Sequence, residues 1–289
     1  MIGRYVDIDG IRTHYFEAGD GPTVVLLHSG KFGGAAELSW EFVLPELARH
    51  FHVLAPDVLG FGRTDKIFDF ADPRGRSMRH LSQFVRRMLA ERGHDQADFV
   101  GNSMGASNLL RVAALNPELL PIRSLVIASG GGFVPVTPER QTLLAYDGTP
   151  EAMRAMLRAM LHDPKWAADD AYIARRQELA LLPGAWECAA APRLKLAARS
   201  RPAEGFGQPD STPYESIRVP TLIVAGAEDR LRLPGYAEEF GRRIPCSEVH
   251  VFERCGHCPN LEQPDRFNEL VVGFLRRVHL GDIAWTKNL

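Results

Sequence analysis

The segment Asp98–Gly105 reads D-F-V-G-N-S-M-G and joins an apolar run to a helical pattern. Its first residues predict a strand, and helical periodicity follows from about residue 104 to about residue 115. Between the two, G-N-S-M-G fits G-x-S-x-G, whose glycines let the chain turn sharply enough to present Ser103 on a strained elbow. The pattern alone also occurs in ordinary Gly/Ser turns. The strand before it and the helix after it favour a nucleophilic serine.

An alternation of strands and helices extends outward from this elbow. T-V-V-L-L-H at 23–28 is almost continuously apolar, which is typical of a strand buried on both faces of a parallel sheet. Further strands are predicted at 11–17, 52–57 and 122–129, and helices at 39–49 and 77–93; the N-terminal stretch also alternates like a strand. The rhythm predicts an α/β fold with a mostly parallel central sheet flanked by helices.

A long segment without strand signal interrupts this alternation. It contains scattered prolines and several helical patterns, of which M-R-A-M-L-R-A-M-L-H at 153–162 is the clearest. Strands are predicted again at 219–226 and 247–252, and helices at 235–243 and 265–278. We therefore expect a core formed by residues 1–132 and 216–289, with an inserted helical cap, or lid, at 133–215. Such a cap covers the carboxyl ends of the strands, where open α/β sheets bind ligands.

A serine hydroxyl needs a base and an orienting acid before it can act as a nucleophile. Both residue types follow predicted strands. A-G-A-E-D-R supplies Glu228 and Asp229, and F-E-R-C-G-H supplies His257 in a Gly-flanked loop. Either carboxylate could instead be a solvated turn residue, so the pattern leaves both open. The order nucleophile, acid, histidine is that of the α/β-hydrolases.

A tetrahedral oxyanion would need two hydrogen-bond donors. The backbone N–H of Met104, directly after the nucleophile, is the expected first donor. The second is expected from the loop H-S-G-K-F-G-G, which is rich enough in glycine for backbone to approach a ligand, and Gly30 is the preferred residue. Gly33 and Gly34 are explained equally well by the dihedral angles of a turn.

Composition excludes several classes of partner. The chain has 289 residues, of which 45% are hydrophobic, and its 34 basic and 36 acidic residues nearly balance. No block of like charge suggests a nucleic-acid or membrane surface, so a small molecule is the expected partner. The N-terminus has neither the apolar stretch of a signal peptide nor a membrane span, which makes a cytoplasmic location the expectation.

Four cysteines are too few for a disulfide framework in so long a chain, which fits a reducing compartment. Cys255 and Cys258 form C-x-x-C around His257, which by itself could be a redox pair or half of a zinc site. The redox interpretation is disfavoured because the next helix is expected only near Pro264. A zinc site is disfavoured because a second pair of ligands is missing. No metal and no organic cofactor are expected.

Several segments resemble the meta-cleavage product hydrolases, a group of α/β-hydrolases that break carbon–carbon bonds. L-L-H-S-G-K-F-G-G resembles their oxyanion loop, H-G-x-G-P-G, and A-P-D-V-L-G-F-G-R-T-D resembles the loop after their next strand. V-G-N-S-M-G resembles their elbow, and R-C-G-H resembles the segment with their catalytic histidine. The resemblance covers nearly the whole chain and implies a homodimer or larger oligomer.

The resemblance implies roles for an acid and for an arginine of the cap. It favours Asp229 over Glu228, because the family places its acid just before a basic residue and a later proline, as in D-R-L-R-L-P. R-Q-E-L-A-L-L-P-G at 176–184 resembles the family's R-Y-x-A-S-x-x-P-G, whose arginine binds the acidic end of the substrate. That arginine maps to Arg176. Three other arginines lie near it in sequence: Arg175, Arg193 and Arg199.

The resemblance also implies further substrate contacts, and the sequence departs from the family at two of them. Asn102 is expected to contact the substrate, although a structural hydrogen bond in the elbow would also explain it. Ser29 stands where glycine is usual, and Cys258 stands where many members carry tryptophan, so the pocket there is expected to be wider. An apolar wall is expected from cap residues, namely Trp186 with Met153 or Met156, each of which could be simple core.

The implied reaction is hydrolysis of a 2-hydroxy-6-oxo-dienoate formed by ring cleavage of a catechol. After ketonisation of the dienol, Ser103 or a water that it positions would attack the remote carbonyl, and a carbon leaving group would depart as a dienolate, with His257 moving the protons. Three alternatives share the fold. They are a carboxylesterase or lactonase, a receptor that keeps the triad as a relic, and a cofactor-free oxygenase.

Overall fold

The computed structural model describes residues 2–191 and 207–282 and contains one mixed sheet. Its strands are β1 (Gly3–Ile8), β2 (Ile11–Ala18), β3 (Thr23–Leu27), β4 (His52–Pro56), β5 (Ala97–Asn102), β6 (Ile122–Ala128), β7 (Thr221–Gly226) and β8 (Ser247–Phe252). They are ordered β1-β2-β4-β3-β5-β6-β7-β8, and all pairs from β4 to β8 are parallel. The α/β fold with a mostly parallel central sheet that the sequence predicts is confirmed.

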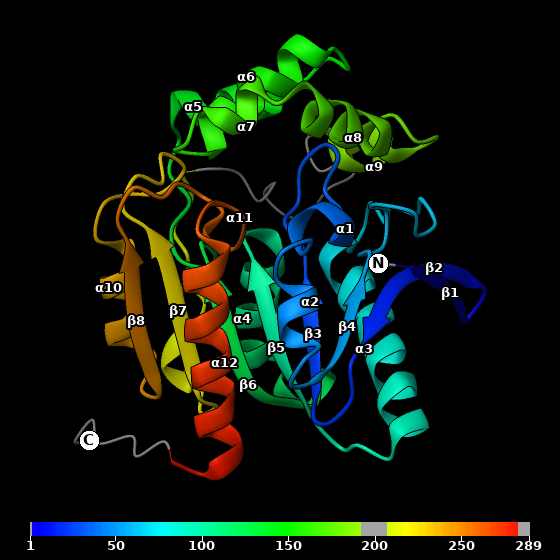
Figure 1. Cartoon of the computed structure of the whole chain (residues 1–289), viewed down its shortest axis with the longest axis vertical. Helices are drawn as coiled ribbons and strands as arrows, with labels where there is room; N and C mark the ends of the chain where they lie inside the picture. Colours follow the sequence, from blue (N-terminus) through cyan, green and yellow to red (C-terminus); the bar gives the residue numbers. More distant parts are fainter. Residues whose placement is uncertain (1, 192–206, 283–289) are drawn as a thin grey trace.

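Helices cover both faces of the sheet and its upper edge (Figure 1). They are α1 (Ala36–Ser39), α2 (Leu44–Leu47), α3 (Pro73–Arg92), α4 (Met104–Leu115), α5 (Pro138–Leu144), α6 (Pro150–Met160), α7 (Lys165–Ala168), α8 (Asp170–Ala180), α9 (Ala185–Ala190), α10 (Tyr236–Arg243), α11 (Pro259–Glu262) and α12 (Pro264–Leu280), with 3₁₀ turns η1 (Pro117–Leu119) and η3 (Tyr214–Ser216). Helices α5 to α9 lie above the carboxyl ends of the strands and form the cap.

Successive side chains of a strand point to opposite faces of the sheet, so an apolar strand needs a cover of helices on both faces. In β3, Val25 and Leu27 pack toward α3, α4 and α10, whereas Val24 and Leu26 pack toward α1, α2 and α12. All four side chains are fully buried. The continuous apolar run in the sequence therefore reflects a strand that is covered on both faces, as predicted.

Two local features of the N-terminal part differ from the sequence prediction. The alternating N-terminal stretch is a hairpin of β1 and β2, joined at Asp9 and Gly10, which both have positive φ as a two-residue hairpin turn requires. The single helix predicted at 39–49 is wrong: α1 and α2 are separate short helices. Pro45 lies in the middle of that range, where it has no N–H to donate and would crowd the preceding turn of a continuous helix.

A buried carboxylate ties the loop after β4 to the rest of the core. Asp57 accepts hydrogen bonds from the N–H groups of Ala36 and Arg63, both at 2.8 Å, and its Oδ2 lies 2.7 Å from His14 Nδ1. Burial alone would raise the pKa of Asp57, but the His14 hydrogen bond, the nearby histidine charges and the Arg63 N–H lower it below 3.8. The carboxylate thus holds β2, the start of α1 and the loop after β4 together.

Asp57→Asn should lower the free energy of unfolding by about 3 kcal/mol, because an amide cannot accept all of these hydrogen bonds. The folded-state pKa lies below the unfolded value, so this stabilisation is complete well above pH 3.8 and is lost as the pH falls through the folded-state pKa. Urea unfolding at about pH 6 and about pH 3.5 should therefore show a smaller difference between variant and wild type at the lower pH. Asp20→Asn, at a carboxylate that is 92% exposed, is the control and should leave both midpoints nearly unchanged. A constant difference at both pH values would contradict this role of the Asp57 charge.

Candidate active site

Ser103 occupies a strained turn between β5 and α4. Its φ of 54° and ψ of −107° are unfavourable for a residue with a side chain. A Cβ added to Gly101 would lie 2.5 Å from the Ala106 nitrogen, and one added to Gly105 would lie 2.2 Å from the Leu27 carbonyl oxygen. The two glycines of G-N-S-M-G are therefore required because neighbouring backbone approaches both of them closely.

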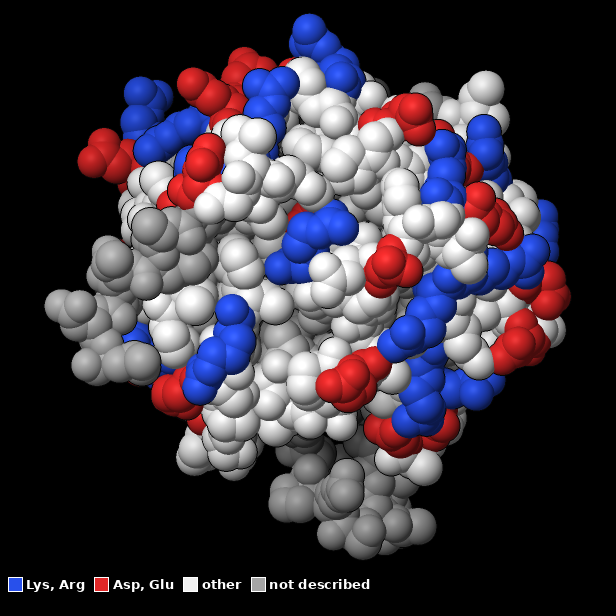
Figure 2. Space-filling model, turned by 90° about the horizontal axis from the view of Figure 1, so that it is seen from below, with Lys and Arg blue, Asp and Glu red and all other residues white. Residues whose placement is uncertain are grey.

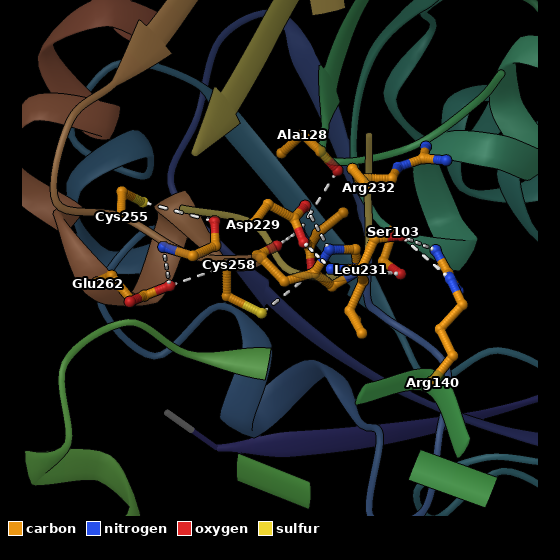
Figure 3. Close-up of polar contacts among 12 residues, drawn as sticks. Ser103, Ala128, Arg140, Asp229, Leu231, Arg232, Cys255, Cys258 and Glu262 are labelled. Carbon is orange, nitrogen blue, oxygen red and sulfur yellow. Dashed lines mark hydrogen bonds and ion pairs between the residues drawn. The ribbon is translucent and has the colours of Figure 1, made fainter. Parts of the chain in front are cut away.

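The ends of β7 and β8 bring an acid and a base to this serine. His257 Nε2 lies 2.8 Å from Ser103 Oγ, and His257 Nδ1 lies 2.7 Å from Asp229 Oδ2. The Leu231 N–H donates to the other Asp229 oxygen at 2.9 Å (Figure 3). His257 and Asp229 are 3% and 8% exposed, so the chain of hydrogen bonds is shielded from water. This arrangement can deprotonate the serine hydroxyl or a water beside it.

The charge of Asp229 suits an orienting acid. Burial alone would raise its pKa, but the charge and hydrogen bond of His257, the Leu231 N–H and the Arg232 charge together lower the pKa below its ordinary value. The carboxylate is thus ionised at neutral pH. Glu228 is directed elsewhere, because its Oε2 accepts the Cys255 N–H at 2.8 Å. Of the two candidates, the structure brings Asp229 to the histidine.

The two expected oxyanion donors lie side by side. A Cβ added to Gly30 would lie 3.0 Å from Met104 Sδ, so the oxyanion loop packs directly on the first residue of α4. Within residues 2–191 and 207–282, neither the Gly30 N–H nor the Met104 N–H donates a hydrogen bond. Ser29 is buried beside them, and its carbonyl accepts a hydrogen bond from His28 Nδ1 at 2.8 Å. Contact of Ser29 with a substrate stays a prediction.

Arg176 is buried in the cap without a counter-ion among the described residues. It lies on α8, is 3% exposed, and its Nε and Nη2 have no hydrogen-bond partner in the described part of the chain. A Cβ on Gly33 would lie 2.4 Å from the Arg176 carbonyl oxygen, so α8 rests on the oxyanion loop. Arg175 instead pairs with Glu41 at the surface. The remaining two arginine candidates, Arg193 and Arg199, lie outside the described residues.

Asn102 and Cys258 support the histidine loop. The Asn102 amide donates to the carbonyls of His257, at 3.2 Å, and Ala128, at 3.4 Å, and its Oδ1 lies 3.8 Å from Cys258 Sγ. Both polar groups of the Asn102 amide are thus used within the protein, so the geometry fits the structural explanation. Contacts of Asn102 and Cys258 with a substrate stay predictions.

The apolar residues expected to line the pocket are placed differently from one another. Met153 and Met156 are fully buried in the cap core. Trp186 is 43% exposed on α9, with its ring stacked 6.2 Å from that of Phe32. Because Trp186 lies at the surface of the cap, the structure does not place it in a buried wall, and its substrate contact stays a prediction.

The C-x-x-C cysteines are buried thiols. Burial raises the pKa of both Cys255 and Cys258, which disfavours a reactive thiolate. The expectation that the next helix starts only near Pro264 is wrong, because the short α11 begins at Pro259 with Cys258 as its N-cap. Cys255, the first cysteine of the motif, is not at the N-terminus of this helix. Within the described ranges, no group of three or more His, Cys, Asp or Glu side chains could hold a metal ion.

Glu262 was not singled out by the sequence and links the cap to the histidine loop. Its Oε2 accepts the His162 N–H at 2.6 Å, and its Oε1 accepts the Gly256 N–H at 2.9 Å. The His257 N–H itself donates to the carbonyl of Met160, the last residue of α6, at 2.8 Å. Burial raises the pKa of Glu262 although these N–H groups oppose the shift. No local motif marks the link to the cap, because His162 is 100 positions away from Glu262 in the sequence.

The opposite end of the sheet has different properties. A broad hollow there is lined by polar and surface residues at the amino ends of β3, β5 and β6, including Thr23, Gln96 and Ile122, far from Ser103. On this face basic and acidic side chains are intermixed, and no large area of one sign is visible (Figure 2). The hollow lies apart from the candidate catalytic residues, which gather under the cap.

Glu262→Gln should loosen the cap and the histidine loop together. The amide nitrogen of glutamine cannot accept a hydrogen bond from a backbone N–H, so one of the two segments loses its acceptor. The free energy of unfolding should therefore fall by about 1–3 kcal/mol. Hydrogen exchange should speed up in the peptides that contain His162 and His257. Glu269→Gln, at an exposed position of α12, is the matched control. Unchanged exchange in both peptides would contradict the link.

Comparison with known proteins agrees with this geometry. A sequence model of the alpha/beta hydrolase family matches residues 24–270. A 2-hydroxy-6-oxo-6-(2'-aminophenyl)hexa-2,4-dienoic acid hydrolase of Metapseudomonas resinovorans is 33% identical over 96% of this chain and 91% of that protein. A 2-hydroxymuconate semialdehyde hydrolase of Pseudomonas sp. strain CF600 is 30% identical over 98% of this chain and 97% of its own.

Solved structures extend the comparison to three dimensions. A serine hydrolase involved in carbazole degradation has a TM-score of 0.79 and 32% identity and covers 95% of this chain and 98% of its own. A meta-cleavage product hydrolase from Pseudomonas fluorescens IP01 has a TM-score of 0.81 and 28% identity over 96% of this chain and 98% of its own. With its elbow serine and the histidine and acid after the last strands, the chain belongs to the alpha/beta hydrolase family.

Proposed function

We propose that this protein is a serine-dependent hydrolase that cleaves a carbon–carbon bond in a 2-hydroxy-6-oxo-dienoate, a product of aromatic ring cleavage. One observation carries the proposal: the hydrogen-bonded Ser103–His257–Asp229 chain lies under a cap whose Arg176 is buried, with two nitrogens unpaired in the described structure. A buried guanidinium without a partner is costly, and a substrate carboxylate would offset that cost with bidentate hydrogen bonds. The names of the relatives at 30% identity and above support the same substrate class.

In the proposed reaction Arg176 holds the carboxylate of the dienol end, and the remote carbonyl carbon lies at Ser103. Ketonisation of the dienol first makes the bond next to that carbonyl breakable. Ser103, or a water that it positions, then attacks the carbonyl carbon while His257 accepts the proton, and Asp229 stabilises the resulting imidazolium. The Gly30 and Met104 N–H groups would bind the oxyanion.

Collapse of the tetrahedral intermediate breaks the carbon–carbon bond. The electron pair leaves with the dienoate fragment as a dienolate, and His257 returns a proton to it. If Ser103 is the nucleophile, the acyl group stays on its oxygen until a water, deprotonated by His257, attacks it and releases the acid and the free serine. On either route the net change is the addition of one water across the bond, which gives a carboxylic acid and a 2-hydroxydienoate. The reaction contains no redox step. His257 accepts and returns the protons.

Hydrolysis of an ester or lactone is the second candidate. It requires the same serine, histidine, acid and oxyanion donors, but it has no use for a buried cationic residue in the cap. Arg176 is the feature that favours the dienoate. The assembled hydrogen-bond chain favours turnover over the receptor alternative. A homo-oligomer stays a prediction. Among the described residues, none of the helices has the length and hydropathy of a membrane span.

Replacing Ser103 or Arg176 should separate these functions. With a coloured 2-hydroxy-6-oxo-dienoate, Ser103→Ala should abolish the loss of colour, and Arg176→Met should lower kcat/KM at least about 30-fold, because a buried charge pair is lost. Arg175→Met is the neighbouring control on α8 and should retain most of the activity. Fast turnover of p-nitrophenyl esters with no turnover of the dienoate would support the esterase instead.

Replacing each acidic residue of the loop after β7 tests which one orients the histidine. Asp229→Asn should lower kcat by about 10⁴-fold, because the amide favours the wrong histidine tautomer and removes the charge. Glu228→Gln keeps an oxygen that can accept the Cys255 N–H, so its kcat should fall far less. Equal losses in the two variants, measured by single-turnover kinetics, would contradict the assignment of Asp229.

A further inference from the structure

A second group of buried polar side chains lies on the other side of Ser103 from Arg176. Arg232, in the loop between β7 and α10, is 6% exposed, and its two terminal nitrogens donate to the carbonyls of Phe133, at 3.2 Å, and Gly131. Within the part of the chain that the structure describes, Arg232 Nε has no hydrogen-bond partner and no carboxylate forms an ion pair with the guanidinium. The side chain is therefore incompletely satisfied.

Two hydroxyl groups beside Arg232 are also unsatisfied. The Arg232 guanidinium carbon lies 4.7 Å from the centre of the Tyr236 ring. Burial raises the pKa of Tyr236, while the Arg232 charge and the Ser129 hydroxyl act against this shift, so the three side chains lie together. Among the described residues, however, neither Tyr236 Oη nor Ser129 Oγ reaches a partner with good hydrogen-bond geometry.

A second buried cation approaches from the cap. Arg140 on α5 is 7% exposed and donates from Nε to the Leu231 carbonyl at 3.1 Å (Figure 3). Burial and the charge of Arg232 lower the pKa of Arg140 to about 10. Two guanidinium groups thus act on each other in a region where Asp229 is the neighbouring anion. That anion is already engaged with His257.

Sheet order places these cations opposite Arg176. Ser103 follows β5, whereas Ser129 follows β6 and Arg232 follows β7, on one side of β5. Arg176 rests on Gly33 in the loop after β3, on the other side of β5. In Figure 3, Arg140 and Arg232 lie on one side of Asp229, and Cys258 and Glu262 lie on the other. A bound molecule that extends in both directions from Ser103 would meet a buried guanidinium at each end.

We propose that the acyl side of the site binds a carboxylate, so that the substrate is a dicarboxylate with one acidic group at Arg176 and a second at Arg232 and Arg140. This inference rests on the proposed function and specifies its substrate. Buried charges in proteins are normally paired, and an anion that accepts from Arg232 Nε and from the two hydroxyls would satisfy all three unpartnered atoms.

The chemistry of the reaction sets where that second group must be. Attack occurs at the carbonyl carbon that joins the dienoate to its substituent, so the substituent extends away from Arg176, beyond Ser103. Hydrolysis transfers one oxygen of water to this carbonyl carbon and releases the substituent as a carboxylic acid. A substituent that already ends in a carboxylate therefore leaves as a dicarboxylic acid.

Two dienoates that differ only at the end of the substituent test the proposal: one ends in a carboxylate and the other in the carboxamide of the same shape. The wild type should turn over the carboxylate with kcat/KM at least about 30-fold higher than the carboxamide, as expected for a buried charge pair. Arg232→Met should remove most of this preference. Arg230→Met, at an exposed arginine in the same loop that donates to the Arg158 carbonyl, should keep the preference.

Binding of product acids to the wild type gives a measurement that needs neither a variant nor turnover. Dicarboxylic acids of three to six carbons should bind, by calorimetry, at least about 10-fold tighter than monocarboxylic acids of equal length. Equal binding, or equal turnover of the carboxylate and the carboxamide, would overturn the second anion site. If no dienoate is turned over but dicarboxylic acids bind selectively, the proposed reaction fails while the anion site stands.

Discussion

The site depends on the backbone turn at Ser103. A positive φ at a residue with a side chain costs on the order of 1–3 kcal/mol, and such a conformation persists only where the surroundings impose it. Here the Ser103 N–H donates to the Ala128 carbonyl at the end of β6, and its carbonyl accepts from both the N–H and the hydroxyl of Ser107. Strand β6 on one side and helix α4 on the other therefore fix the elbow. The same parallel order of strands brings the loops after β7 and β8 close enough to supply an acid and a base.

Negative and positive charges lie on opposite sides of His257. The ionised Asp229 lies behind His257, so it stabilises a proton on the imidazole without approaching the serine. Buried guanidinium groups lie in front, in the cap and in the acid loop. A neutral ligand would leave Arg176 and Arg232 without a counter-charge from the described residues, whereas an anionic ligand would replace the water that they lose on burial. The cap covers the site, and the cap and the acid loop together supply its positive charge.

Residues whose function depends on local pattern could be predicted from the sequence. Ser103 and His257 follow strands that periodicity alone identifies, and the glycines of the elbow are required by the turn itself. Arg176 needed the family resemblance, since an arginine in a helix has no local mark of burial. The contacts of Asn102 and Glu262 could not be predicted, because each bonds to backbone groups more than 90 positions away. The short helices α1 and α2 are a different case, because Pro45 was a local signal that outweighed the helical periodicity.

The attachment of the cap is uneven, and this sets how the site can open. At the end of α6, buried backbone groups bond to the Met160 carbonyl and to Glu262, next to His257. On the α8 side, partly exposed ion pairs join Arg63 to Glu178 and Arg175 to Glu41, and such pairs contribute little. If the cap opened at the α8 edge, it would pivot about the histidine loop. Such an opening would move Arg176 away from Ser103 and leave the hydrogen bonds among Ser103, His257 and Asp229 at the pivot.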